Sequence, residues 1–146
     1  MLRNGLIVLA EDDPDDRLLL EQAFVDVGAS TDRVFVEDGE DLMEYLLGRG
    51  RHEGRQDRRP DLILLDLNMP RKDGREALAE IRADPTLRRI PVVVLTTSSE
   101  EQDIEEAYGL GANSFVTKPI TFDGLVGVVR TIQDYWFRTV TLPRAG

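Results

Sequence analysis

Five side chains with charged or reactive groups directly follow short apolar runs in this sequence. They are Glu11, Asp12, Asp66, Thr96 and Lys118. A single carboxylate after a strand is usually a turn residue or a helix cap, and a single lysine is usually solvated. Three carboxylates that converge with an ammonium and a hydroxyl would form a site. We expect that site to need a cation as well, because carboxylates placed together repel and raise one another's pKa.

The chemistry that these groups favour is phosphoryl transfer assisted by a metal ion. Carboxylate oxygens with room for water are the ligands that Mg²⁺ prefers, and Mn²⁺ accepts the same ligands. Asp66 is predicted to be the nucleophile, since a carboxylate can form an acyl phosphate. Asp12 and Asp66 are predicted to bind the metal, with Glu11 supporting it through water and the main-chain carbonyl of Asn68 as a further ligand. The ammonium and hydroxyl would neutralise phosphoryl oxygens.

A parallel sheet would bring these distant residues together. Five short runs rich in β-branched or aliphatic residues predict strands, at 5–10, 33–36, 62–65, 92–95 and 114–117. Segments with helical spacing lie between them and after the last. This alternation predicts an α/β fold with right-handed crossovers and helices on both faces of the sheet. The carboxyl ends of parallel strands share one edge, where ligands bind.

Local signals predict where the helices begin and end. Asp13, which proline follows, is expected to start the first helix. Capping boxes are expected at 73–76 and 99–102, led by an aspartate and a serine. Gly28 and Gly109 are expected to end helices in the left-handed conformation. Asp38 also follows a strand, but we expect it to be a turn residue and helix cap, because that strand should lie away from the site.

Composition narrows the function classes. The 146 residues suit one domain, predicted over 1–138, with a tail at 139–146. Without cysteine the chain has no disulfide and no thiolate site. A net charge of −10 argues against nucleic-acid binding. No apolar run is long enough to cross a bilayer, so no membrane contact is expected and cytoplasm is the expected location. The basic stretch 48–59 is interpreted as a solvated loop, with a partner contact as the alternative, and His52 within it is expected to be exposed.

At the candidate site residues the chain resembles a known family. "LAEDDPDD", "LILLDLNMP", "VVVLTTSS" and "FVTKP" are similar to the four signatures of response-regulator receiver domains, the CheY-like family. The resemblance implies a flavodoxin/CheY-like three-layer sandwich with strand order 2-1-3-4-5. It implies a signalling receiver, not an enzyme, that accepts a phosphoryl group on Asp66 from a sensor histidine kinase.

The same resemblance implies roles for other residues. Glu11 and Asp12 would be the acidic pair, Thr96 the switch hydroxyl and Lys118 the lysine that contacts phosphate. Phe115 would be a switch aromatic that packs inward or outward with phosphorylation state. The peptide bond between Lys118 and the proline after it is expected in cis.

A finer resemblance links the chain to single-domain regulators of bacterial and cyanobacterial phytochrome histidine kinases. It rests on the "AEDDP" start, the long loop before the third strand, "LTTSS" and the ending "DYWFRTVTLP". A phosphatase of the HAD class is the alternative, because it too uses an aspartate nucleophile with magnesium. That class has a second aspartate two residues after the nucleophile, where this chain has Asn68, so we disfavour it.

The chain is predicted to form a homodimer through its last helix and tail. Val128 and Tyr135 fall outside the apolar stripe of that helix and would be exposed in a monomer. Val140 and Leu142 alternate with threonines, which predicts a strand-like arm that reaches across a two-fold axis. The alternative is a frayed tail, as chain termini commonly are.

Overall fold

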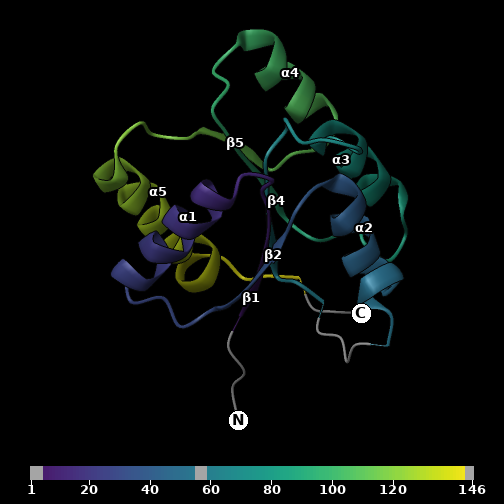
Figure 1. The fold of residues 1–146 in the computed structure, drawn as a ribbon, viewed down its shortest axis with the longest axis horizontal. Coiled ribbons are helices and arrows are strands. Elements are labelled where there is room, and N and C mark those ends of the chain that lie inside the picture. The colour runs from purple at the N-terminus through teal and green to yellow at the C-terminus, as the bar shows by residue number, and fades with distance from the viewer. Residues whose placement is uncertain (1–4, 55–58, 144–146) are drawn as a thin grey trace.

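The computed structural model describes residues 5–54 and 59–143, in which strands and helices alternate along the chain (Figure 1). The elements are β1 (Leu6–Ala10), α1 (Pro14–Asp26), β2 (Asp32–Val36), α2 (Gly39–Leu47), the short 3₁₀ helix η1 (Gly50–His52), β3 (Leu62–Leu65), α3 (Gly74–Ala83), β4 (Val92–Thr96), α4 (Glu101–Gly109), β5 (Ser114–Thr117), α5 (Phe122–Asp134) and the π-helical turn η2 (Tyr135–Thr139).

The five strands form one parallel sheet in the order β2-β1-β3-β4-β5, which confirms the predicted topology. Register brings the ends of the central strands level, because Ala10 pairs with Leu65. At the β5 side, Thr96 pairs with Thr117. The residues that follow these strands therefore emerge at one edge of the sheet.

Two apolar layers enclose the sheet, because alternate strand residues point to opposite faces. One layer joins the sheet to α1 and α5 through residues such as Phe24 and Val129. The other joins it to α2 and α3 through residues such as Leu42 and Leu78. Strands β1, β3 and β4 are buried along their whole length, as expected of parallel strands covered on both faces. Figure 1 shows α1 and α5 on one side of the sheet and α2 and α3 on the other.

Several predicted helix ends are confirmed. Asp13 caps α1, its carboxylate accepting from the amides of Asp15 at 2.8 Å and Asp16 at 3.3 Å. Asp73 caps α3 by accepting from the amide of Glu76 at 3.1 Å. Gly28 has a φ of 70° just after α1, in the left-handed region that favours glycine.

Two predictions for α4 are wrong. The helix begins at Glu101, and Glu100 stands at its cap without a side-chain hydrogen bond, so Ser99 does not cap it. At the other end α4 includes Gly109, and the left-handed residue is Gly111, with a φ of 105°. The chain makes a further turn after Gly109, because the amide of Leu110 donates to the carbonyl of Glu106 at 2.9 Å.

The first part of the basic stretch, residues 48–54, packs on α2, and residues 55–58 lie outside the described residues. The prediction that His52 is exposed is wrong, because its side chain is 14% exposed and its Nε2 lies 2.9 Å from Oδ1 of Asp41. Arg51 binds the same carboxylate, with 2.5 Å between Nη2 and Oδ2. The buried carboxylate of Asp41 needs hydrogen-bond partners, and the loop supplies them.

The strand-like arm predicted for the tail is wrong. The chain stays helical through Thr139, because the amide of Val140 donates to the carbonyl of Tyr135 at 3.0 Å. Residues 140–143 have no regular secondary structure. The ring of Phe137 packs so closely on Gly5 that a side chain there would clash. Within 5–54 and 59–143, every helix is too short or too polar to cross a bilayer.

Candidate functional site

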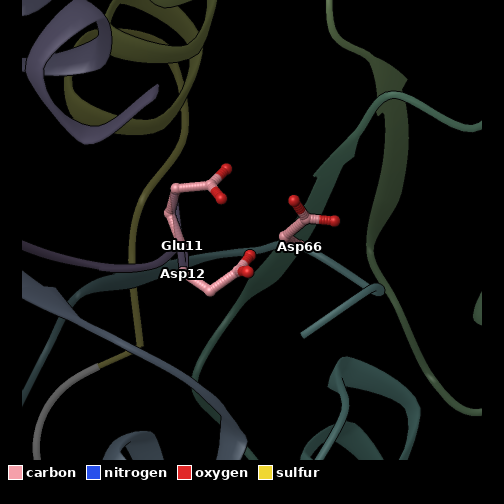
Figure 2. Close-up of side chains that lie close together, drawn as sticks. All are labelled: Glu11, Asp12 and Asp66. Carbon is pink, nitrogen blue, oxygen red and sulfur yellow. The ribbon is translucent and has the colours of Figure 1, made fainter. Parts of the chain in front are cut away.

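Three carboxylates meet at the carboxyl edge of the sheet. One carboxylate oxygen each from Glu11, Asp12 and Asp66 lies within 4.8 Å of the others. Glu11 and Asp12 follow β1 and Asp66 follows β3, and these strands are hydrogen-bonded neighbours. Figure 2 shows Glu11 and Asp12 side by side, with Asp66 opposite them. Glu11 and Asp66 are largely buried and Asp12 is exposed, so the group opens to solvent on one side.

Lys118 reaches this group from the end of β5. Its Nζ forms a short ion pair with Glu11 and lies 3.2 Å from Oδ2 of Asp66 and 3.5 Å from Oδ2 of Asp16. Burial alone would lower the pKa of Lys118, but the hydrogen bond to Glu11 and the charge of Asp66 outweigh it and raise that pKa. The lysine is therefore a fixed cation in the site. Asp16 lies in the first turn of α1, where the helix dipole favours an acidic residue, so the sequence gives no signal for its contact with Lys118.

The three carboxylates of the site outnumber its one ammonium, that of Lys118. Burial raises the pKa of Glu11 to about 7, although Lys118 and the amide of Asp13 oppose the rise. The charge of Asp66 adds to it. One ammonium does not balance the three carboxylates, so a further cation at their meeting point would favour the ionised form of Glu11. Hard oxygen ligands of this kind fit Mg²⁺ or Mn²⁺.

Thr96 ends β4 as the only buried side-chain polar group in the described part of the chain without a hydrogen-bond partner. Its main-chain carbonyl accepts from the amide of Lys118 at 2.7 Å, which ties the ends of β4 and β5 together. Buried hydroxyls are nearly always paired, and an unpaired one costs about 1–3 kcal/mol. A hydroxyl left in this condition beside Lys118 is available to an incoming ligand oxygen.

The main-chain carbonyl of Asn68 stays a predicted metal ligand. The amide of Asn68 donates to Oδ1 of Asp66 at 3.1 Å, so the loop after β3 turns back on the phosphoacceptor candidate. The expected cis bond before Pro119 is wrong, because no cis peptide bond occurs in 5–54 or 59–143. A bond before proline still favours trans by about 0.5–1 kcal/mol.

Two further sequence expectations concern residues beside the site. Phe115 is half-buried against the apolar layer of α2 and α3, and its amide donates to Oη of Tyr108 at 3.2 Å. Asp38 caps α2, as expected, by accepting from the amide of Asp41 at 2.8 Å. It also binds Arg71, with 2.6 Å between Oδ2 and Nε. Asp38 does not join the acidic group, because β2 is the outermost strand on its side.

Sequence reasoning missed the contacts that surround the site. The Cα of Gly74 faces the main-chain oxygen of Asp66 so closely that any side chain there would clash. Arg75, the next residue, binds Asp103 of α4 at 2.9 Å. The "DG" pair at 73–74 was a signal for the close approach, because glycine is common where backbones meet. Nothing local in the sequence pairs Arg75 with a residue 28 positions away.

Comparison with known proteins gives a consistent result. The response regulator receiver domain, as a family, matches residues 7–130. Response regulator Rcp1 of Synechocystis sp. is 43% identical over 140 residues, which span 96% of this chain and 94% of Rcp1.

Solved structures agree with the sequence match. The phosphorylated cyanobacterial phytochrome response regulator RcpA superposes with a TM-score of 0.89 at 45% identity, covering 97% of this chain and 100% of RcpA. The Mn²⁺-bound form of Rcp1 gives a TM-score of 0.86 at 42% identity, covering 96% of this chain and 99% of that one. With the fold, the four motifs and the acidic group in agreement, this chain belongs to the response regulator receiver domain family and is a signalling receiver of the two-component type.

Proposed function

We propose that Asp66 accepts a phosphoryl group from a phosphohistidine of a sensor histidine kinase, in a reaction that requires a divalent cation. The observation that carries this proposal is the position of Asp66, 3.2 Å from the ammonium of Lys118 and within 4.8 Å of two other carboxylates. An oxygen of Asp66 attacks phosphorus as the bond from phosphorus to the imidazole nitrogen breaks. The imidazole keeps the bonding electrons and takes a proton from solvent, and an acyl phosphate remains on Asp66.

Four groups would hold the cation, which we propose is Mg²⁺ or Mn²⁺. They are the carboxylates of Glu11, Asp12 and Asp66 and the main-chain carbonyl of Asn68. Bound there, the cation would neutralise charge on the transferring phosphoryl group. The donor set supports this assignment, because three carboxylate oxygens lie within 4.8 Å of one another and one ammonium, that of Lys118, faces them. A relative solved with Mn²⁺ supports it too.

Lys118 and Thr96 would recognise the phosphoryl group once it is attached. The ammonium of Lys118 already lies against Asp66, so it can contact phosphoryl oxygens by a small movement. The buried hydroxyl of Thr96 would gain the partner that it lacks. We propose that this new bond draws the end of β4 toward the site and changes the packing of Phe115, which is half-buried beside it.

We further propose that the kinase partner is of the phytochrome type and docks beside Lys118. RcpA is described as a cyanobacterial phytochrome response regulator, and it is 45% identical to this chain. Leu19, Ile120 and Phe122 are exposed and line a cleft of about 150 Å³ that Lys118 also borders. An apolar surface next to the reacting carboxylate suits a protein phosphodonor that must approach Asp66 closely. The net charge of −10 supports protein partners over nucleic acid.

We also propose that the chain forms a homodimer, through a different contact from the predicted arm. Because the tail is not a strand, we place the contact on β5, an edge strand, and on the end of α5 together with η2. There Val116, Ile132, Tyr135 and Trp136 line an open groove of about 390 Å³. Tyr135 is 50% exposed, as predicted for a residue outside the apolar stripe, whereas Val128 packs partly against the core.

Incubation with a small-molecule phosphodonor and Mg²⁺, followed by intact mass measurement, tests the proposed reaction. We expect the wild-type chain to gain one acid-labile phosphoryl group and the Asp66→Asn variant to gain none. Asp38→Asn is the matched control, because it alters another carboxylate after a strand and an asparagine can still cap α2. Continuous turnover of the donor without a stable adduct would favour a phosphatase and contradict the proposal.

A further inference from the structure

Helix α4 is held to the rest of the molecule by few apolar contacts. Of its nine residues, all described, Ala107 is the one that is buried. Tyr108, on the same helix, is 49% exposed. In Figure 1, α4 projects at the end of the molecule near β5 and the start of α3, while the other helices lie along the faces of the sheet. Polar contacts must therefore supply much of what fixes its position.

A chain of polar contacts links α4 to α3 and to the loop after β4. Nη2 of Arg75 lies 2.9 Å from Oδ1 of Asp103, and Nε of Arg75 makes a short contact with Glu106. The other oxygen of Asp103 accepts from Oγ of Ser98 at 2.6 Å. The Ser98 hydroxyl and then the Arg75 guanidinium hold the pKa of Asp103 below its ordinary value. Asp103 is therefore ionised and bonded on both sides near neutral pH.

Both ends of this chain of contacts adjoin the phosphorylation site. Arg75 follows Gly74, which packs directly on the main-chain oxygen of Asp66. Ser98 stands two residues after Thr96, whose buried hydroxyl has no partner within the described chain. Movement of Thr96 toward a phosphoryl group would pull on the loop that Ser98 belongs to. Asp103, which Arg75 holds in place, resists that pull.

We propose that Arg75, Asp103 and Ser98 form a clamp that restrains α4 and the β4–α4 loop in the unphosphorylated state. The inference rests on the proposed phosphorylation of Asp66 and concerns how that site is regulated. A ligand can shift a two-state equilibrium only by its different affinity for the two states. Part of the binding free energy of the phosphoryl group is therefore used to open the clamp. Breaking the clamp beforehand removes that cost, so the site binds a phosphoryl analogue more tightly.

Calorimetric titration with beryllofluoride and Mg²⁺ tests the clamp. We expect Arg75→Ala and Asp103→Asn each to bind beryllofluoride about two- to fivefold more tightly than wild type, a range typical of partly exposed ion pairs. A simple charge effect predicts opposite signs, because one variant loses a cation and the other an anion near an anionic ligand. Lys72→Ala is the matched control, since it breaks an ion pair of 2.5 Å with Glu80 within the α3 region and leaves α4 untouched.

Hydrogen exchange gives a second readout that needs no ligand. Without Mg²⁺ or beryllofluoride, amides of α4 should exchange about two- to fivefold faster in both clamp variants and at the wild-type rate in Lys72→Ala. Unchanged or weaker beryllofluoride binding in either clamp variant overturns the clamp. Failure of the wild-type chain to bind beryllofluoride at all is a different result, because it overturns the proposed function of Asp66.

Discussion

At the scale of single residues, the site contains a buried carboxylate and a buried hydroxyl in environments that are unfavourable for them in the free protein. Burial raises the pKa of Glu11 to about 7 despite its ion pair with Lys118. Thr96 is buried without a hydrogen-bond partner in the described chain. Both conditions cost stability in the free protein, and a cation and a phosphoryl group would relieve them. Unmet requirements of this kind are expected where function, and not stability, selects the residue.

Replacing Thr96 by valine separates the effect of its hydroxyl on stability from its effect on the response to a phosphoryl analogue. The change removes a buried unpaired hydroxyl, so the free energy of unfolding should stay equal or rise by up to about 1 kcal/mol in urea titrations. The beryllofluoride-induced change in hydrogen exchange of α4 should be lost. Thr31→Val is the control, because Oγ1 of Thr31 donates to Oε1 of Gln133 at 3.3 Å. The free energy of unfolding of that control should fall by about 1 kcal/mol. A similar fall in Thr96→Val would contradict the assignment of its hydroxyl as unpaired.

At the scale of elements, the strands and helix ends that depend on local sequence patterns could be predicted from the sequence. The strands β1, β3 and β4 were recognisable as apolar runs because they are buried on both faces, and Asp13, Asp73 and Gly28 marked helix ends by short-range chemistry. The acidic group was predictable once a parallel sheet was expected, since strand ends share an edge. These predictions needed no knowledge of contacts between distant side chains.

Predictions failed where distant contacts decide the structure. His52 is held by Asp41, which lies 11 positions earlier. The end of the chain stays helical and places Phe137 against Gly5, at the opposite end of the sequence. The clamp on α4 joins Arg75 to a residue 28 positions later. None of these pairs has a periodic or local signature, so the sequence alone could not reveal them.

The contact between α2 and the loop after it predicts a pH dependence of stability. Burial would raise the pKa of Asp41, but hydrogen bonds from Arg51, the Glu37 amide and His52 outweigh it and hold the pKa well below its ordinary value of 3.8. A carboxylate with a depressed folded-state pKa stabilises the fold above the unfolded value and loses that contribution as pH falls through the folded value. Stability from Asp41 should therefore be complete above pH 3.8 and decline below it.

Urea unfolding of Asp41→Asn at several pH values tests this dependence. The free energy of unfolding of the variant should be about 1–3 kcal/mol lower than that of wild type at pH 7. The reason is that Arg51 and His52 then contact a neutral amide in place of a carboxylate. The difference from wild type should shrink as the solution becomes more acidic than pH 3.8. A difference that stays constant across the acid range would show that packing, and not the charge of Asp41, is responsible.

At the scale of the whole molecule, the acidic group lies next to the surface that we propose for the kinase. The acidic group and Lys118 lie at one edge of the sheet, and the exposed apolar cleft beside Lys118 adjoins it. The groove lined by Val116, Ile132 and Tyr135 lies where β5 meets the end of α5. Helix α4 is bound to Arg75 at the start of α3 and to Ser98 in the loop after β4. It also contacts β5, because Oη of Tyr108 accepts from the amide of Phe115, so it lies between the surroundings of the proposed phosphorylation site and the β5 edge.

The groove predicts self-association that depends on its aromatic residues. Sedimentation of the wild-type chain at micromolar concentration should detect dimers, and Tyr135→Ser should shift the population toward monomer. The substitution removes an exposed ring, so folding should be little affected. Leu18→Ser is the control, because Leu18 is 58% exposed on α1. Monomers for the wild type with and without beryllofluoride would exclude the β5 and α5 contact.

The central claim is that phosphate attaches to Asp66. Borohydride reduction of the phosphorylated chain converts an aspartyl phosphate to homoserine, and peptide mass mapping then locates the converted residue. After incubation with Mg²⁺ and a phosphodonor, we expect homoserine at position 66 and at no other carboxylate, and none when Mg²⁺ is removed by a chelator. Homoserine at position 12, a reduced glutamyl side chain at position 11, or a stable phosphate that borohydride does not reduce would contradict the assignment of Asp66 as the phosphoacceptor.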